Sequence, residues 1–162
     1  MPRILIVAYG NPLRCDDGVG WRAADALQRK FTAGEVEILR LHQLAPEIAD
    51  ALRDRELVIF LDAACVNDSE NSRPGEIHIR EIAAAEKQER QASQFSHVYS
   101  PGKILQLARE LYGAAPKTTV VTVAGGDFDH GDHLSDSVEN ALPSVVSQLD
   151  QIIREHIPTR YR

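Results

Sequence analysis

Residues 4–22 read ILIVAYGNPLRCDDGVGWR, and this stretch decides the fold. The apolar run Ile4–Ala8 ends at a Gly-Asn pair, and its length and composition are typical of a buried strand. After a short loop, the adjacent acids Asp16 and Asp17 precede an amphipathic segment that predicts a helix. Both carboxylates are therefore expected at the carboxyl end of a strand, which is the edge where open α/β sheets bind ligands.

Strands and helices continue to alternate along the rest of the chain. Apolar or alternating runs bounded by turn residues predict strands, and apolar residues at helical spacing predict helices. The expected strands cover residues 36–41, 57–61, 76–80 and 118–124, and the expected helices cover residues 19–29, 46–52, 102–112 and about 135–156. This order predicts an α/β fold in a single domain of residues 1–162, namely a three-layer sandwich in which helices flank a mostly parallel central sheet of about five strands.

Three local details of this fold are also predicted. In the strand at residues 76–80, Ile77 and Ile79 are expected to face inward. Residues 81–94 are rich in Ala, Glu, Gln and Lys, and they are expected to be helical, mobile or both. Pro143 is expected to bend or interrupt the first part of the last helix, because proline removes a helical hydrogen bond.

Composition excludes several classes of protein. A chain of 162 residues can bury a core without disulfides or a structural metal. The formal net charge of -6 is spread along the chain without a basic block, so we expect no nucleic-acid partner. The amino terminus lacks the pattern of a signal peptide, and no run approaches the ~20 apolar residues of a membrane span. We therefore expect a cytoplasmic protein without a membrane partner, and we expect a monomer.

The two cysteines, Cys15 and Cys65, are expected to be reduced thiols, as is usual in a cytosolic chain. Each follows or ends a predicted strand, so an approach to one another or to a metal is the alternative. Nothing in their spacing supports that alternative.

Common catalytic and nucleotide-binding motifs are missing from the sequence. The loop GNPLRCDDGVG matches neither GxxxxGK[ST] nor GxGxxG, and its two carboxylates would repel phosphates. There is likewise no GxSxG nucleophile elbow and no HExxH zinc motif. Nucleotide binding, serine-hydrolase chemistry and zincin chemistry are therefore disfavoured.

A segment rich in acids and imidazoles follows the last predicted strand. Taken alone it could hold a metal, but it lacks the calcium-loop pattern, and its residues are too close in sequence to converge without tight folding. We favour a polar loop at the rim of the sheet edge, with His130 and His133 as second-choice ligands. The sequence does not decide whether this segment takes part in the site through Asp127, Asp129, His130 or His133.

A simpler metal site combines Asp17, Asp62 and His97. Asp62 follows the apolar strand at residues 57–61, where a lone aspartate is usually a cap or a turn residue. His97 precedes a helix, where a lone histidine is usually solvent-exposed or structural. Neighbouring strands lie only ~5 Å apart, so carboxylates at two strand ends can reach one ion. Two carboxylates and one imidazole suit a divalent transition metal and leave coordination positions open.

The first loop also carries a family resemblance. Residues 10–20, GNPLRCDDGVG, resemble the GNxLxxDDGxG signature of the hydrogenase maturation endopeptidases. The resemblance continues in the expected order over nearly the whole chain, at Val58–Ala63, at Ser96-His97 with Pro101 and Leu105–Arg109, and from Leu134 to Pro143.

The resemblance implies a peptidase that removes a C-terminal extension from the large-subunit precursor of a nickel-iron hydrogenase, after nickel insertion. In that family the metal-contacting positions correspond to Asp17, Asp62 and His97, which we take as the catalytic set with Asp16 in support. The nickel is expected to belong to the precursor, and the resting metal is not predicted. The alternatives are a non-catalytic, metal-dependent chaperone that docks on the precursor and a general metallopeptidase with its own zinc.

Overall fold

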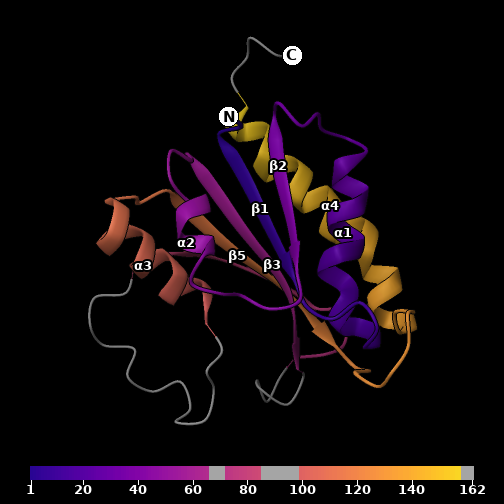
Figure 1. Ribbon diagram of the computed structural model, residues 1–162. Helices are drawn as coiled ribbons and strands as arrows, with labels where there is room; N and C mark the ends of the chain where they lie inside the picture. The colour runs from indigo at the N-terminus through magenta and orange to yellow at the C-terminus, as the bar shows by residue number, and fades with distance from the viewer. Residues whose placement is uncertain (66–71, 85–98, 158–162) are drawn as a thin grey trace.

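A five-stranded sheet with the strand order β2-β1-β3-β5-β4 forms the centre of the computed structural model (Figure 1). The structure describes residues 1–65, 72–84 and 99–157. The strands are β1 (Ile4–Tyr9), β2 (Val36–Leu41), β3 (Leu57–Cys65), β4 (Ile77–Ile82) and β5 (Lys117–Gly125). The helices are the 3-10 turn η1 (Cys15–Gly18), α1 (Val19–Gln28), α2 (Ile48–Ala51), α3 (Pro101–Tyr112) and α4 (Asp136–His156).

The two most apolar runs of the sequence form adjacent strands in the interior of the sheet. β1 pairs in parallel with β2 on one side and with β3 on the other, and β3 pairs in parallel with β5. Residues 4–8 and 57–61 are at most 1% exposed, because strands between parallel neighbours are covered on both faces. Only β4, at the edge, runs antiparallel, against β5.

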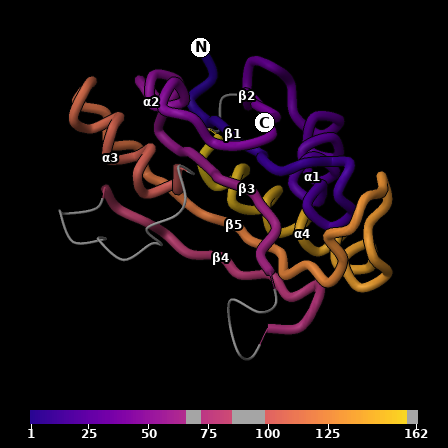
Figure 2. The backbone as a smooth tube through the Cα atoms, turned by 60° about the horizontal axis from the view of Figure 1, so that its bottom comes forward, coloured from indigo at the N-terminus to yellow at the C-terminus, as the bar shows by residue number. Residues whose placement is uncertain are grey.

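Helices cover both faces of the sheet and complete three layers, as the sequence predicts (Figures 1 and 2). Because side chains alternate along a strand, β3 gives Ile59 and Leu61 to the core layer shared with α1 and α4. It gives Val58 and Phe60 to the opposite layer, which contains residues of α2 and α3. Asp62, next in this alternation, therefore belongs to the α2–α3 face.

Most of the predicted elements are confirmed within a few residues, but several details differ from the prediction. The helix predicted at residues 46–52 is shorter in the structure, where α2 covers Ile48–Ala51. The residues before it are wound more tightly, by hydrogen bonds between residues three apart such as Ala49 N to Pro46 O. Ile77 packs against the core, but Ile79 is 41% exposed, since the edge strand β4 is only partly covered. α4 passes through Pro143 without interruption.

The prediction that a strand ends before Asp62 is wrong in a way that matters for the site. Pairing between β1 and β3 ends at Ala8 and Leu61, but pairing between β3 and β5 continues to Cys65 and Gly125. Asp62 is thus the first residue of β3 without a partner in β1, beside the point where the β1 chain turns away.

The predicted segment at residues 81–94 falls mostly outside the described residues, apart from its start in β4 and the two residues that follow. Within the described ranges, no helix has both the length and the apolar character needed to cross a bilayer.

Candidate active site

Asp16 is fully buried, and its carboxylate accepts four hydrogen bonds from the loop between β5 and α4. Gly126 N and Asp127 N donate to Oδ2 at 2.8 and 2.9 Å. Ser135 donates twice, from its backbone N to Oδ1 at 2.7 Å and from its hydroxyl to Oδ2 at 2.8 Å. Burial alone would raise the pKa of Asp16, but these hydrogen bonds outweigh it and hold the pKa below its usual value. Asp16 therefore joins two loops and has little capacity left for a ligand.

Asp17, the next residue of the turn, is only partly buried. Its Oδ2 accepts a hydrogen bond from Asn11 N at 2.7 Å. Gly10 makes this packing possible, since it has a φ of 139° and a Cβ there would lie 2.1 Å from the carbonyl oxygen of Asp17. The end of β1 thus presses against the backbone that carries Asp17 and fixes the position of its carboxylate.

Asp62 is a partly exposed residue with a mostly buried carboxyl group close to Asp17. Burial is the main reason that its pKa rises to about 7, and the charge of Asp17 raises it further. Hydrogen bonds from Ala63 N, at 2.7 Å, and from the Tyr9 side chain oppose the rise. The two carboxylates predicted to share a site therefore interact electrostatically at one edge of the sheet.

Tyr9 is a member of this site that the sequence analysis missed. It is the last residue of β1 and packs against the core layer on the α2–α3 face. Its hydroxyl donates to Asp62, and its pKa is raised well above the usual value by burial, by the charge of Asp62 and by this hydrogen bond. The periodicity of β1 places residue 9 on this face, but the sequence does not reveal that Asp62 lies next to it.

His97, the third predicted ligand, lies outside the described residues. The chain is described again from Tyr99, which packs on the core layer of α2 and α3, the face to which Asp62 belongs. Ser100 then caps α3 by accepting a hydrogen bond from Lys103 N at 3.2 Å. The described chain therefore resumes, at Tyr99, on the same face of the sheet as Asp62, and the role of His97 stays a prediction.

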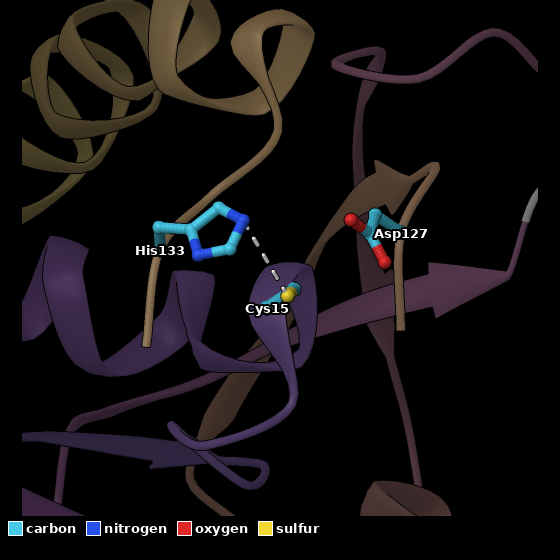
Figure 3. Close-up of side chains that lie close together, drawn as sticks. All are labelled: Cys15, Asp127 and His133. Atoms are coloured by element: carbon cyan, nitrogen blue, oxygen red, sulfur yellow. Dashed lines mark hydrogen bonds between the residues drawn. The ribbon is translucent and has the colours of Figure 1, made fainter. Parts of the chain in front are cut away.

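The acid- and imidazole-rich loop after β5 is a rim loop, as predicted, but two of its residues converge on Cys15. Figure 3 shows Cys15 between His133 and Asp127. Cys15 Sγ lies 4.0 Å from His133 Nε2, and the possible ligand atoms of the three residues all lie within 4.8 Å of one another. Asp129 and His130 are not part of this group. Neither cysteine forms a disulfide, in agreement with the prediction of reduced thiols; Cys15 is buried and Cys65 is exposed.

Several solved structures with the same fold are hydrogenase maturation peptidases. The maturating endopeptidase HybD from Escherichia coli matches with a TM-score of 0.75 and 26% identity, over 99% of both chains. The chain has the fold of hydrogenase maturation endopeptidases. The maturation protease HycI from Thermococcus kodakarensis KOD1 matches with a TM-score of 0.73 and 19% identity, over 94% of this chain and 92% of that one. HybD from Thermococcus kodakarensis matches with a TM-score of 0.66 and 24% identity, over 93% of this chain and 99% of that one.

No protein-family model matches this chain, and no curated protein matches it significantly. The neighbours from Thermococcus establish the shared fold. The neighbour from Escherichia coli matches nearly end to end at higher identity, and it supports the prediction that this protein is a hydrolase, more specifically an endopeptidase.

Proposed function

We propose that this protein is an endopeptidase that removes the C-terminal extension of a nickel-iron hydrogenase large-subunit precursor after nickel has been inserted. The observation that carries the proposal is the pair of interacting carboxylates, Asp17 and Asp62, at one edge of the sheet. The similarity to HybD of Escherichia coli supports the peptidase class, since that protein is a hydrogenase maturating endopeptidase. We expect the protein to act as a cytoplasmic monomer that meets the precursor transiently.

The electrostatics of the pair favour a precursor that carries a divalent cation. Asp17 and Asp62 repel each other, and burial adds a desolvation penalty to the ionised form of Asp62. A nickel ion held by the precursor removes that repulsion when it reaches both carboxylates. A precursor without nickel leaves the repulsion in place, so its binding is weaker.

His97 completes the proposed contact to nickel from the segment that precedes α3. Carboxylate and imidazole donors suit a divalent transition metal and leave positions open for the precursor's own ligands. Tyr9, which donates to Asp62, keeps that carboxylate in one orientation. Asp16 takes no part in the contact in this proposal, because its four hydrogen bonds assign it to the support of the loop.

The proposed reaction is hydrolysis of one peptide bond. Water adds to the scissile carbonyl, the C–N bond breaks, and the leaving amine takes up a proton. The precursor's nickel would supply Lewis acidity to the carbonyl or the water, and Asp17, Asp62 and His97 would hold the metal and thereby place the bond at this edge of the sheet. The charge on these carboxylates and their fixed positions are what the protein contributes to the reaction.

The test is the intact mass of a nickel-loaded large-subunit precursor before and after incubation with this protein, with nickel-free precursor alongside. We expect a C-terminal peptide to be lost only from the loaded form. Binding without any change of mass would favour a docking chaperone and contradict the proposal. Cleavage of unrelated peptides by protein that contains its own zinc would favour a general metallopeptidase and also contradict it.

A further inference from the structure

We propose that Cys15, Asp127 and His133 form a second metal site, which binds a zinc ion and joins the loop after β1 to the loop after β5. The site differs from the proposed nickel contact in its ligands, since a thiol replaces one carboxylate. It also adjoins Asp16, because Asp127, one of the proposed ligands, donates its backbone N–H to the Asp16 carboxylate. This inference does not rest on the proposed peptidase function.

The geometry of the three side chains is close to that of a zinc site. Bonds of about 2.3 Å to sulfur and 2.0 Å to nitrogen separate the two ligand atoms by roughly 3.5 Å in a tetrahedral site. Cys15 Sγ and His133 Nε2 are 4.0 Å apart, so closure by about half an ångström, within the range of a rotation of the exposed His133 side chain, is enough. Asp127 reaches the thiol from the other side and hydrogen-bonds to it.

The backbone holds the two loops together before any ion binds. Cys15 N donates to Gly131 O at 2.9 Å, and Gly131 N donates to Leu13 O at 2.9 Å. Asp16 N donates to Asp127 O at 2.9 Å. Two of the proposed ligands, Cys15 and Asp127, therefore come from backbone that is already fixed, which lowers the entropy lost when the ion binds.

Gly131 leaves room for an ion beside the sulfur and the imidazole. A Cβ at this position would lie 2.9 Å from Cys15 Sγ and 2.9 Å from His133 Cε1. The glycine therefore keeps open the space that the two ligands share. A larger residue would push them apart without removing either donor.

The donors match zinc in type as well as in spacing. Thiolate, imidazole and carboxylate are the three side-chain ligands that zinc uses in proteins, and three of them leave a fourth position for water. Two further acids, Asp16 and Asp129, add negative charge around the thiol, which attracts a cation. Binding releases the thiol proton of Cys15 to solvent, and the sulfur donates a lone pair to zinc.

Titration of reduced, untagged, chelator-treated protein with Co²⁺ tests this site directly. We expect a sulfur-to-cobalt charge-transfer band that saturates and that Zn²⁺ then abolishes by displacing the cobalt. Zinc at about a hundred times its Kd should raise the Tm by roughly 5–10 °C. The band reports only a site with a sulfur ligand, so it separates this site from the proposed nickel contact.

Matched variants decide the assignment. Cys15→Gly should abolish the band and the zinc-dependent Tm shift while the metal-free protein still folds, because Cys15 has a φ of 47° that suits glycine. Gly131→Ala should weaken zinc binding at least tenfold with all three ligands present. Cys65→Ser and Asp62→Asn should keep both the band and the shift. A wild-type protein without the band, or a band that survives Cys15→Gly, would overturn the proposal.

Discussion

Asp16 is a buried acid and Asp62 a partly buried one on a neighbouring segment, and their surroundings shift their pKa values in opposite directions. Asp16 is surrounded by donors, and its four hydrogen bonds lower its pKa. The carboxyl group of Asp62 is placed beside another acid, and burial raises its pKa to about 7. The first arrangement stabilises the ionised form, and the second destabilises it.

This difference separates a residue that supports the fold from a residue available to a ligand. A carboxylate whose lone pairs are all used contributes to stability and cannot also bind a cation well. A carboxylate that is kept ionised at an energetic cost gains most when a cation arrives. The pair Asp16-Asp17 places the two roles side by side in one short turn, because among the residues that the structure describes the Asp17 carboxylate accepts a single hydrogen bond, from Asn11 N.

The largest effect is expected from Asp16→Ala. Four donors would lose their acceptor in a buried place, so we expect a loss of about 3–5 kcal/mol in the free energy of unfolding. Urea unfolding followed by circular dichroism measures it. The adjacent change Asp17→Asn keeps an acceptor for Asn11 N and should alter stability by no more than about 0.5 kcal/mol. Equal losses in the two variants would break the comparison.

An effect of the opposite sign is expected from Asp62→Asn. Because the pKa of Asp62 is raised to about 7, its ionisation at pH 8 disfavours the folded state relative to the unfolded chain, where the group ionises near its usual pKa. The amide cannot ionise, so the variant should be more stable by about 1–3 kcal/mol in chelator-treated protein at pH 8. The gain should shrink at pH 5, where the wild-type carboxyl group is protonated in the folded protein. A destabilised variant at pH 8 would show that the carboxylate serves the fold.

A smaller effect should follow Ser135→Ala. This change removes the hydroxyl donor to Asp16 but keeps the backbone N–H that donates to the same carboxylate. We expect a loss of about 1–2 kcal/mol, less than for Asp16→Ala, measured by the same unfolding experiment. Ser137, exposed in the first turn of α4, is the matched control, and its change to Ala should have almost no effect. If Ser135→Ala lost as much stability as Asp16→Ala, the Ser135 hydroxyl alone would account for most of the stability that Asp16 provides.

The sequence predicts the fold well because the fold depends on local patterns. The apolar runs that became β1 and β3 are long enough to identify buried strands, and the helices follow from their periodicity. The length of β3 could not be predicted in the same way. Residues 62–65 stay in the strand because β5 continues beside them, and that pairing joins segments about sixty residues apart.

The division of roles within the site depends on contacts that local patterns do not encode. The local sequence does not tell which acid of the pair Asp16-Asp17 supports the loop. The hydrogen-bond donors to Asp16 lie far away in the chain, at Gly126, Asp127 and Ser135. The proximity of Cys15 to His133 likewise joins residues that are 118 positions apart. The proposal for Asp17, Asp62 and His97 rests on a resemblance as well as on geometry, and it stays a prediction.

Cleavage by Asp62→Asn is the measurement that tests the central claim most directly. The variant and the wild-type protein would be incubated with the same nickel-loaded precursor, and the fraction that loses the C-terminal peptide would be followed by intact mass. The account predicts at least about a hundredfold slower cleavage by a variant that is as stable as the wild type or more so. Cleavage at the wild-type rate by the folded variant would contradict the role assigned to Asp62.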